Sequence, residues 1–125
     1  MTQKTVLVAD DEPNIVISLE FLLQREGYRV LVARDGQEAM DIMAGELPDL
    51  LLLDNMMPRK SGFEVCQEMR ADPRLQGVKI LMLSAKGRET DIVKGLALGA
   101  DAYMTKPFSV RELADKIARM LQARA

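Results

Sequence analysis

The chain has 125 residues, of which 48% are hydrophobic and 29% charged, and this composition suits one globular domain with a single core. Its 17 basic and 19 acidic residues leave a formal charge of -2, which excludes a strong general attraction to nucleic acid or to anionic membranes. Histidine is absent, so zinc sites and catalytic triads that depend on imidazole are excluded as well.

Five short apolar segments at similar spacing predict five β-strands. They cover residues 5–10, 28–33, 49–54, 78–84 and 101–106. The stretches between them repeat apolar residues at helical spacing, most clearly at 15–23 and 113–121. Strands and helices are therefore expected to alternate along the whole chain.

Helix boundaries are predicted by capping residues and glycines. Helix starts are indicated by Ser or Asp followed three residues later by Glu, at Asp35 with Glu38, Ser61 with Glu64, and Ser109 with Glu112. Gly27, Gly45 and Gly99 stand where the preceding helices should end. These signals agree with the helical spacing, so we expect helices on both sides of each central strand.

Alternating strands and helices predict an α/β fold with a parallel sheet covered by helices on both faces. In such open sheets the functional crevice lies outside the carboxyl ends of the strands. The residues that follow each predicted strand are therefore the candidates for a functional site.

The third predicted strand delivers a carboxylate to that position. Leu50 to Leu53 form an apolar run between Pro48 and Pro58, too short for a stable helix and typical of a strand buried on both faces. Asp54 follows directly. A carboxylate at the end of a buried strand must be paired, solvated or bound to a metal.

The other strand ends supply its expected partners. Asp10 and Asp11 follow the first strand, Ser84 ends the fourth, and Lys106 follows the fifth. Three carboxylates close together repel one another by about 4 kcal/mol per pair at ~4 Å and an effective dielectric of ~20, so a cation is required. Oxygen ligands without His or Cys favour a hard cation, and Mg²⁺ is the expected ion.

This group of residues fits phosphoryl transfer. As an anion at neutral pH, Asp54 can attack phosphorus without a general base and form an aspartyl phosphate. Mg²⁺ and Lys106 would neutralise charge on the phosphoryl oxygens, and Ser84 would donate a hydrogen bond to one of them. The absence of histidine is then no obstacle.

Four segments together resemble the receiver domain of response regulators in two-component signalling, including chemotaxis regulators. They are "ADDE", "DNMMPRKSGFE", "LSAKG" and "GADAYMTKPF", in that order and each at a predicted strand end. The resemblance covers nearly the whole chain. It implies a single receiver domain over residues 1–125, with a flavodoxin-like, doubly wound (βα)5 fold and strand order 2-1-3-4-5.

The same resemblance assigns roles to individual residues. It implies that Asp54 is the phosphoacceptor and that Asp10 and Asp11 bind Mg²⁺ together with Asp54 and the backbone carbonyl of Met56. Lys106 contacts the phosphoryl group in this family. A second set serves the switch: Ser84 moves towards the phosphoryl group, Tyr103 changes its packing, and the peptide between Lys106 and Pro107 is cis.

The resemblance also implies partners. A histidine kinase or histidine phosphotransfer protein would supply the phosphoryl group. Phosphorylation would change a surface over roughly residues 88–98, 101–104 and 109–121, which would control a downstream protein and permit a homodimer. Ala102 stands where dimerising relatives often carry a second acidic residue, which weakens the dimer expectation. Direct binding to nucleic acid or membrane is not expected.

Three other functions are weighed against this one. A turnover enzyme with an aspartyl phosphate, like haloacid dehalogenases, needs a general acid two residues after the nucleophile, and Met56 cannot serve. The expected protein is therefore no enzyme beyond its own phosphorylation and slow dephosphorylation. A pseudo-receiver used only for interaction would lack an acidic residue or the lysine. Nucleotide or flavin binding would need a phosphate-binding loop, and "DDEPN" stands there instead.

Four further expectations concern the cysteine, the cellular compartment, the phosphate lifetime and the extent of the chain. One cysteine, Cys66, suits a reducing compartment and is predicted to be a buried structural thiol. With no apolar stretch of membrane length and no signal-peptide pattern, we expect a cytoplasmic protein. Met56 and Lys86 occupy positions that modulate phosphate lifetime in the family. Whether the chain is a stand-alone regulator or part of a longer protein stays open.

Overall fold

A computed structural model describes residues 3–85 and 89–122. Its strands are β1 (Thr5–Ala9), β2 (Arg29–Ala33), β3 (Leu50–Asp54), β4 (Lys79–Ala85) and β5 (Ala102–Lys106). Its α-helices are α1 (Pro13–Arg25), α2 (Gly36–Gly45), α3 (Gly62–Arg70), α4 (Glu89–Ala97) and α5 (Val110–Gln122), with a short 3₁₀ helix at Pro73–Leu75. The predicted strands are confirmed to within a few residues, whereas the 3₁₀ helix was not predicted.

The five strands form one parallel sheet in the order β2-β1-β3-β4-β5. This arrangement confirms the predicted flavodoxin-like topology. In the register of β3 with β4, Asp54 lies opposite Leu83, and in that of β4 with β5, Ser84 lies opposite Thr105. Because all strands run the same way, their carboxyl ends meet at one edge of the sheet.

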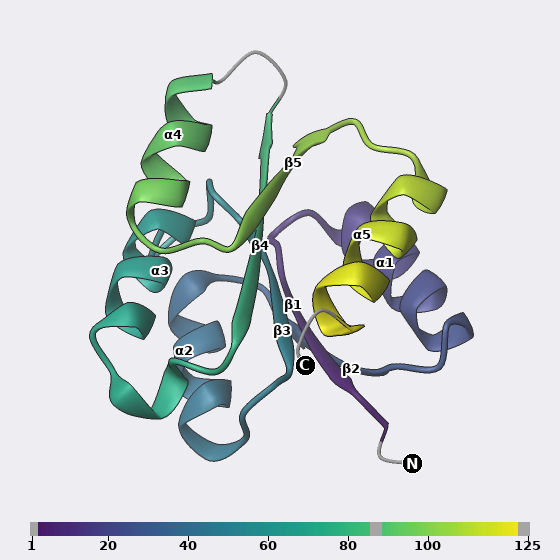
Figure 1. Cartoon of the computed structure of the whole chain (residues 1–125), viewed down its shortest axis with the longest axis horizontal. Helices are drawn as coiled ribbons and strands as arrows, with labels where there is room; N and C mark the ends of the chain where they lie inside the picture. The colour runs from purple at the N-terminus through teal and green to yellow at the C-terminus, as the bar shows by residue number, and fades with distance from the viewer. Residues whose placement is uncertain (1–2, 86–88, 123–125) are drawn as a thin grey trace.

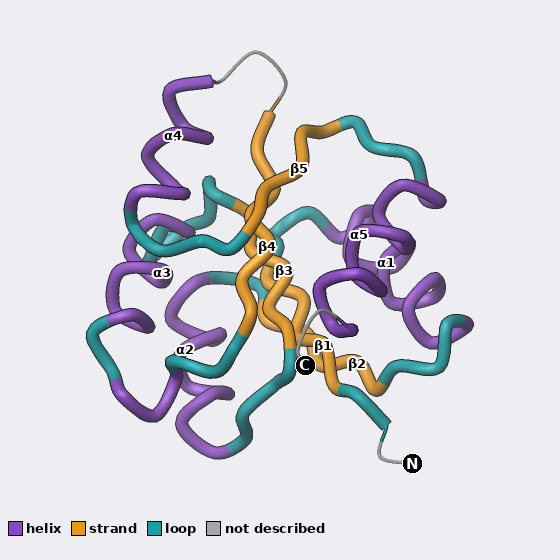
Figure 2. Tube along the Cα trace, in the orientation of Figure 1, coloured by secondary structure: helices purple, strands orange, loops and turns teal. Residues whose placement is uncertain are grey.

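Helices cover both faces of the sheet (Figure 1), and Figure 2 shows the strands as a central layer between them. Helices α1 and α5 pack on one face, and α2, α3 and α4 pack on the other. Strands β1 and β3 are buried along their whole length, which explains their unbroken apolar sequence. Each face thus has its own apolar core.

The edge strands are less buried than the central ones. Residues 29–32 of β2 are exposed or half-buried, and so are all residues of β5. An edge strand lacks a neighbour on one side, so its apolar sequence does not imply burial on both faces. The part of the chain that the structure describes contains no helix long and apolar enough to cross a membrane.

The helix boundaries follow the predicted caps. The Ser61 hydroxyl accepts a hydrogen bond from Glu64 N, and the Glu64 side chain accepts one from Ser61 N. The Ser109 hydroxyl accepts from Glu112 N at the start of α5. Gly27 and Gly99 have φ angles of 94° and 118°, which is the left-handed conformation that glycine adopts without strain after a helix.

Candidate functional site

The carboxyl ends of β1, β3 and β5 bring three charged side chains together. Asp10 follows β1, Asp54 is the last residue of β3, and Lys106 is the last residue of β5. The Lys106 Nζ lies 3.1 Å from Asp10 Oδ2 and 3.4 Å from Asp54 Oδ1. Asp10 is 0% exposed and Asp54 6% exposed, so one ammonium bridges two buried carboxylates.

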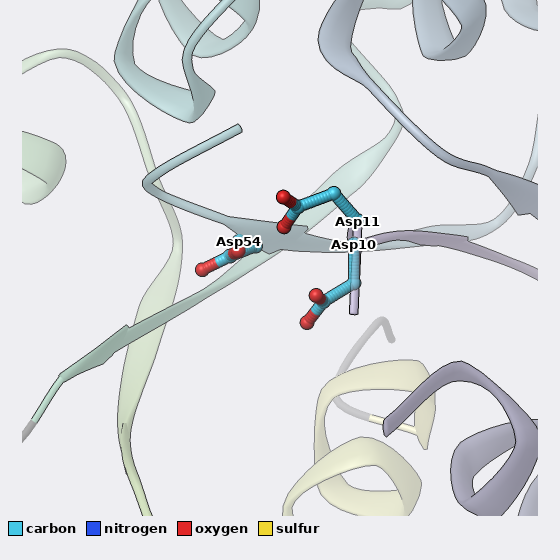
Figure 3. Close-up of side chains that lie close together, drawn as sticks. All are labelled: Asp10, Asp11 and Asp54. Carbon is cyan, nitrogen blue, oxygen red and sulfur yellow. The ribbon is translucent and has the colours of Figure 1, made fainter. Parts of the chain in front are cut away.

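A third carboxylate lies beside them. One carboxylate oxygen from each of Asp10, Asp11 and Asp54 lies within 4.8 Å of the other two (Figure 3). Asp11 is exposed, whereas the other two are buried. Three carboxylates face a single lysine, so negative charge exceeds positive charge at this end of the sheet.

The excess negative charge is reflected in the pKa of Asp54. This pKa is raised from 3.8 to about 6, mainly by burial and also by the neighbouring Asp10 charge. Lys106 and a hydrogen bond from Met56 N oppose the rise but do not cancel it. For Lys106, burial acts to lower the pKa, but Asp54 and Asp10 outweigh it and the pKa is raised.

The residues present fit a hard divalent cation. Three carboxylate oxygens at short mutual distances are the ligands that Mg²⁺ prefers, and a cation would relieve the repulsion that raises the Asp54 pKa. Asp10, Asp11 and Asp54 could supply carboxylate ligands, and the backbone carbonyl of Met56 lies two residues beyond Asp54. The site therefore has the chemistry of a magnesium site.

A buried hydroxyl at the end of β4 lies at the same edge of the sheet. Ser84 is 1% exposed, and its Oγ has no hydrogen-bond partner within residues 3–85 and 89–122. Leaving a buried hydroxyl unpaired costs about 1–3 kcal/mol. An unpaired group in a native structure therefore calls for an explanation, such as a ligand or a conformational change that supplies its partner. The Ser84 hydroxyl is available to donate to an incoming oxygen.

The loop between β3 and α3, residues 55–61, begins directly after Asp54. Asn55 N donates to Leu83 O at 3.0 Å, and Gly62 N donates to Asn55 O at 3.2 Å, so both ends of the loop are anchored. A Cβ on Gly62 would lie 2.3 Å from the backbone oxygen of Asp54, which makes glycine necessary there. Met56 within this loop is 58% exposed.

Four other predictions concern Tyr103, the Lys106–Pro107 peptide, Lys86 and Cys66. Tyr103 on the edge strand β5 is 41% exposed, and the peptide between Lys106 and Pro107 is cis. Lys86 lies outside the described residues. Cys66 is buried, burial raises the pKa of its thiol, and its Sγ lies 3.5 Å from Leu98 O, so the expected structural thiol is confirmed.

Sequence reasoning missed two residues of the 55–61 loop. Asn55 is 2% exposed and its Nδ2 donates to Asp91 Oδ2 of α4 at 3.2 Å. Arg59 has a φ angle of 67°, and its guanidinium binds Asp35 at the start of α2. A polar residue directly after Asp54 was a usable signal for Asn55, whereas no pattern indicated a positive φ at an arginine.

Comparison with known proteins agrees with this geometry. A family model described as "Response regulator receiver domain" matches residues 6–118. The chain is 48% identical over 119 residues to the alkaline phosphatase synthesis transcriptional regulatory protein PhoP of Bacillus subtilis, covering 95% of this chain and 49% of that protein. The chain thus spans about half the length of this relative.

Solved structures show the same similarity. A putative response regulator from Chloroflexus aurantiacus superposes with a TM-score of 0.93 at 33% identity, covering 98% of this chain and 100% of that one. The receiver domain of the sensor histidine kinase PA1611 from Pseudomonas aeruginosa superposes with a TM-score of 0.88 at 28% identity, covering 96% and 98%. That second structure has a magnesium ion coordinated in its active-site cleft.

Proposed function

The chain belongs to the response regulator receiver domain family of two-component signalling, and we propose that it is a magnesium-dependent switch with Asp54 as phosphoacceptor. The observation that carries this proposal is the imbalance at the carboxyl end of the sheet. Three carboxylates share one lysine there, beside a buried hydroxyl without a partner in the described residues. Such a site is completed by a divalent cation and a phosphoryl group.

The proposed reaction begins with an Asp54 carboxylate oxygen attacking the phosphorus of a phosphohistidine. A P–O bond forms, the P–N bond breaks, and the electron pair leaves with the histidine nitrogen. With a pKa of about 6, Asp54 is mostly ionised at neutral pH and needs no general base. Asp10, Asp11, Asp54 and the Met56 carbonyl would hold Mg²⁺, which supplies positive charge to the phosphoryl oxygens when bound.

Two side chains serve the transferred group directly. The Lys106 ammonium already lies within 3.4 Å of Asp54 Oδ1, so it is placed to neutralise a phosphoryl oxygen after transfer. The Ser84 hydroxyl would donate its hydrogen bond to another phosphoryl oxygen. This bond would give the buried Oγ the partner that it lacks within the described residues.

The response is proposed to reach the surface formed by α4, β5 and α5. Ser84 lies opposite Thr105 of β5, two residues from the half-exposed Tyr103. Movement of Ser84 towards a phosphoryl group would therefore act on β5, and Tyr103 would change its packing. We propose that a downstream protein, or a second copy of this chain, reads that change.

Partners and setting complete the proposal. A histidine kinase or histidine phosphotransfer protein is the proposed phosphodonor, in the cytoplasm, and residues 1–125 form one receiver domain. The chain would catalyse only its own phosphorylation and slow dephosphorylation, because Met56 cannot act as the general acid of a turnover enzyme. Direct binding to nucleic acid or membrane forms no part of the proposed role.

The test is the intact mass of the protein after incubation with acetyl phosphate. The wild type should gain one phosphoryl group when Mg²⁺ is present and none when it is removed with EDTA. Asp54→Asn should gain none under either condition. A protein that binds Mg²⁺ but never gains this mass would instead be an interaction module with a receiver fold. A gain that persists in Asp54→Asn would place the phosphoacceptor elsewhere.

A further inference from the structure

Arg59 adopts a backbone conformation that is unusual for its residue type. Its φ angle of 67° makes it the one non-glycine residue with positive φ in residues 3–85 and 89–122. Such a conformation costs roughly 1 kcal/mol or more for a residue with a Cβ, and it persists only where surrounding contacts impose it. Strained backbone of this kind is concentrated at functional sites.

The Arg59 side chain forms a two-point ion pair across 24 residues of sequence. Arg59 Nε donates to Asp35 Oδ2 at 3.0 Å, and its second terminal nitrogen donates to Asp35 Oδ1 at 3.2 Å. Asp35 is itself held in place, because its side chain caps α2 through Glu38 N. Bidentate geometry to a fixed acceptor fixes the guanidinium more firmly than a single surface contact.

The backbone next to Arg59 meets the same helix start. A Cβ added to Gly36 would lie 2.1 Å from the backbone oxygen of Lys60, so the loop touches the first residue of α2 with no space for a side chain. At its other points the loop is held by the Asn55 and Gly62 backbone bonds. Between those bonds, Met57 also packs against the apolar core and the Lys60 ammonium pairs with Glu68, so the Arg59 pair is one of several contacts that hold the loop.

Met56 lies between these anchors, and two of its backbone groups contribute to the site. Its N–H donates to the Asp54 carboxylate, and its carbonyl is the proposed fourth protein ligand of the metal. The side chain itself is 58% exposed and packs too little to hold the loop. The position of the Met56 backbone therefore depends on the rest of the loop, in which Met57 packs against the core and Arg59 pairs with Asp35.

We propose that Arg59 is a positioning residue for the metal site: its ion pair with Asp35 holds the 55–61 loop in the conformation in which the Met56 carbonyl serves as a ligand. The role rests on the proposed magnesium site. Arg59 touches neither metal nor substrate and acts through the loop backbone, as outer-shell groups do at other metal sites.

Electrostatics and positioning predict opposite signs for one variant. Arg59→Gln removes a positive charge near an acidic site, so a purely electrostatic effect would strengthen Mg²⁺ binding. If Arg59 positions the loop, Mg²⁺ binding weakens instead. We expect the dissociation constant for Mg²⁺ to rise about 3- to 10-fold. This effect is small compared with that of most outer-shell partners, because the Arg59 side chain is 60% exposed.

Isothermal titration calorimetry with MgCl₂ measures this directly, with Arg29→Gln as the matched control. Arg29 forms another partly exposed ion pair, with Glu46, and its loss changes the net charge by the same amount. The control should bind Mg²⁺ like the wild type. Phosphorylation of Arg59→Gln should reach the wild-type maximal rate at higher Mg²⁺, because only the metal affinity is changed.

Two further variants test the pair itself. Asp35→Asn retains an N-cap side chain but loses the carboxylate, and combining it with Arg59→Gln should weaken Mg²⁺ binding no more than the stronger single change. Unchanged or tighter Mg²⁺ binding by Arg59→Gln, with the wild type binding normally, would overturn the role of Arg59 alone. Failure of the wild type to bind Mg²⁺ would overturn the metal site as well.

Discussion

Two groups of charged side chains lie at opposite ends of the sheet and differ in how fully they are paired. Where β4 and β5 begin, the Arg70 guanidinium donates to four backbone carbonyls and to Asp101 Oδ2 at 2.9 Å. Asp101 Oδ2 also accepts from Ile80 N at 2.7 Å. Where the strands end, three carboxylates share Lys106, and the Ser84 hydroxyl has no partner within residues 3–85 and 89–122.

The contrast separates a structural group from a functional one. At the Arg70 end, all three nitrogens of the guanidinium donate hydrogen bonds, so the group joins α3, β4 and β5 and contributes to stability. At the Asp54 end, excess negative charge and a buried hydroxyl without a partner among the described residues oppose folding. The proposed binding of a cation and a phosphoryl group would account for a site that weakens the free protein.

The largest effect on stability is expected from Arg70, at the end of the sheet where the charged groups are paired. Arg70→Ala would leave several carbonyls and the Asp101 carboxylate without their donor, so the free energy of unfolding should fall by about 4 kcal/mol. Urea denaturation measures it. Arg29→Ala, which removes a partly exposed pair with Glu46, should cost below about 1 kcal/mol. Equal losses for the two variants would contradict the structural role of Arg70.

A substitution at Asp54, at the other end of the sheet, should raise stability instead of lowering it. Asp54→Asn removes a carboxylate whose folded pKa, about 6, exceeds its unfolded value of 3.8. Asp54 thus stays protonated up to a higher pH in the folded wild type than in the unfolded chain, and the wild type loses stability as the pH rises from about 4 to about 6. In EDTA at neutral pH, the variant should be more stable by about 3 kcal/mol, since each pKa unit corresponds to about 1.4 kcal/mol.

Magnesium should narrow this difference. Saturating Mg²⁺ stabilises only a protein that binds it, by about 1.4 kcal/mol at ten times the dissociation constant, so the wild type should gain and Asp54→Asn should gain less. Thermal unfolding at pH 4.5 and 7.5, with EDTA or MgCl₂, resolves both effects. A variant less stable than the wild type in EDTA at pH 7.5 would contradict the account of the acidic end.

A smaller effect is expected from the hydroxyl. Ser84→Ala removes a buried oxygen without a partner in the described part of the chain, so the free energy of unfolding should rise by up to about 1 kcal/mol. Phosphorylation by acetyl phosphate should nevertheless slow by at least about 10-fold, because a donor to the phosphoryl group is lost. Ser84→Thr is the matched control, since it keeps a hydroxyl. Slowing by Ser84→Thr equal to that by Ser84→Ala would point to packing instead.

The smallest effect concerns the lifetime of the phosphorylated state. Met56 is 58% exposed beside Asp54, and its bulk should hinder the approach of water to an aspartyl phosphate. Met56→Asn should shorten the half-life about threefold, which corresponds to under ~1 kcal/mol of activation free energy, with little change in stability. The half-life follows from intact mass over time after removal of the phosphodonor. An equal or longer half-life would be evidence against shielding by Met56.

The sequence by itself determined the elements and the content of the site. Unbroken apolar runs such as Leu50 to Leu53, alternating with segments of helical spacing, were sufficient for a parallel α/β sheet, because only strands covered on both faces carry such runs. Since parallel strands end at one edge, Asp10, Asp54 and Lys106 could be placed together before any coordinates. Capping pairs such as Ser61 and Glu64 were equally readable, because a cap involves residues only three apart.

Only the tertiary structure decided how these residues are paired. Lys106 bridges Asp10 and Asp54, and Arg70 joins Asp101. Ser84 Oγ lacks a partner in the described residues. Each of these findings depends on the distance between segments that are far apart in sequence. The residue with the positive φ, Arg59, is likewise paired with Asp35, across 24 residues. Local patterns encode backbone preference and burial, whereas pairing depends on where the folded chain brings distant side chains, and those distances exist only in three dimensions.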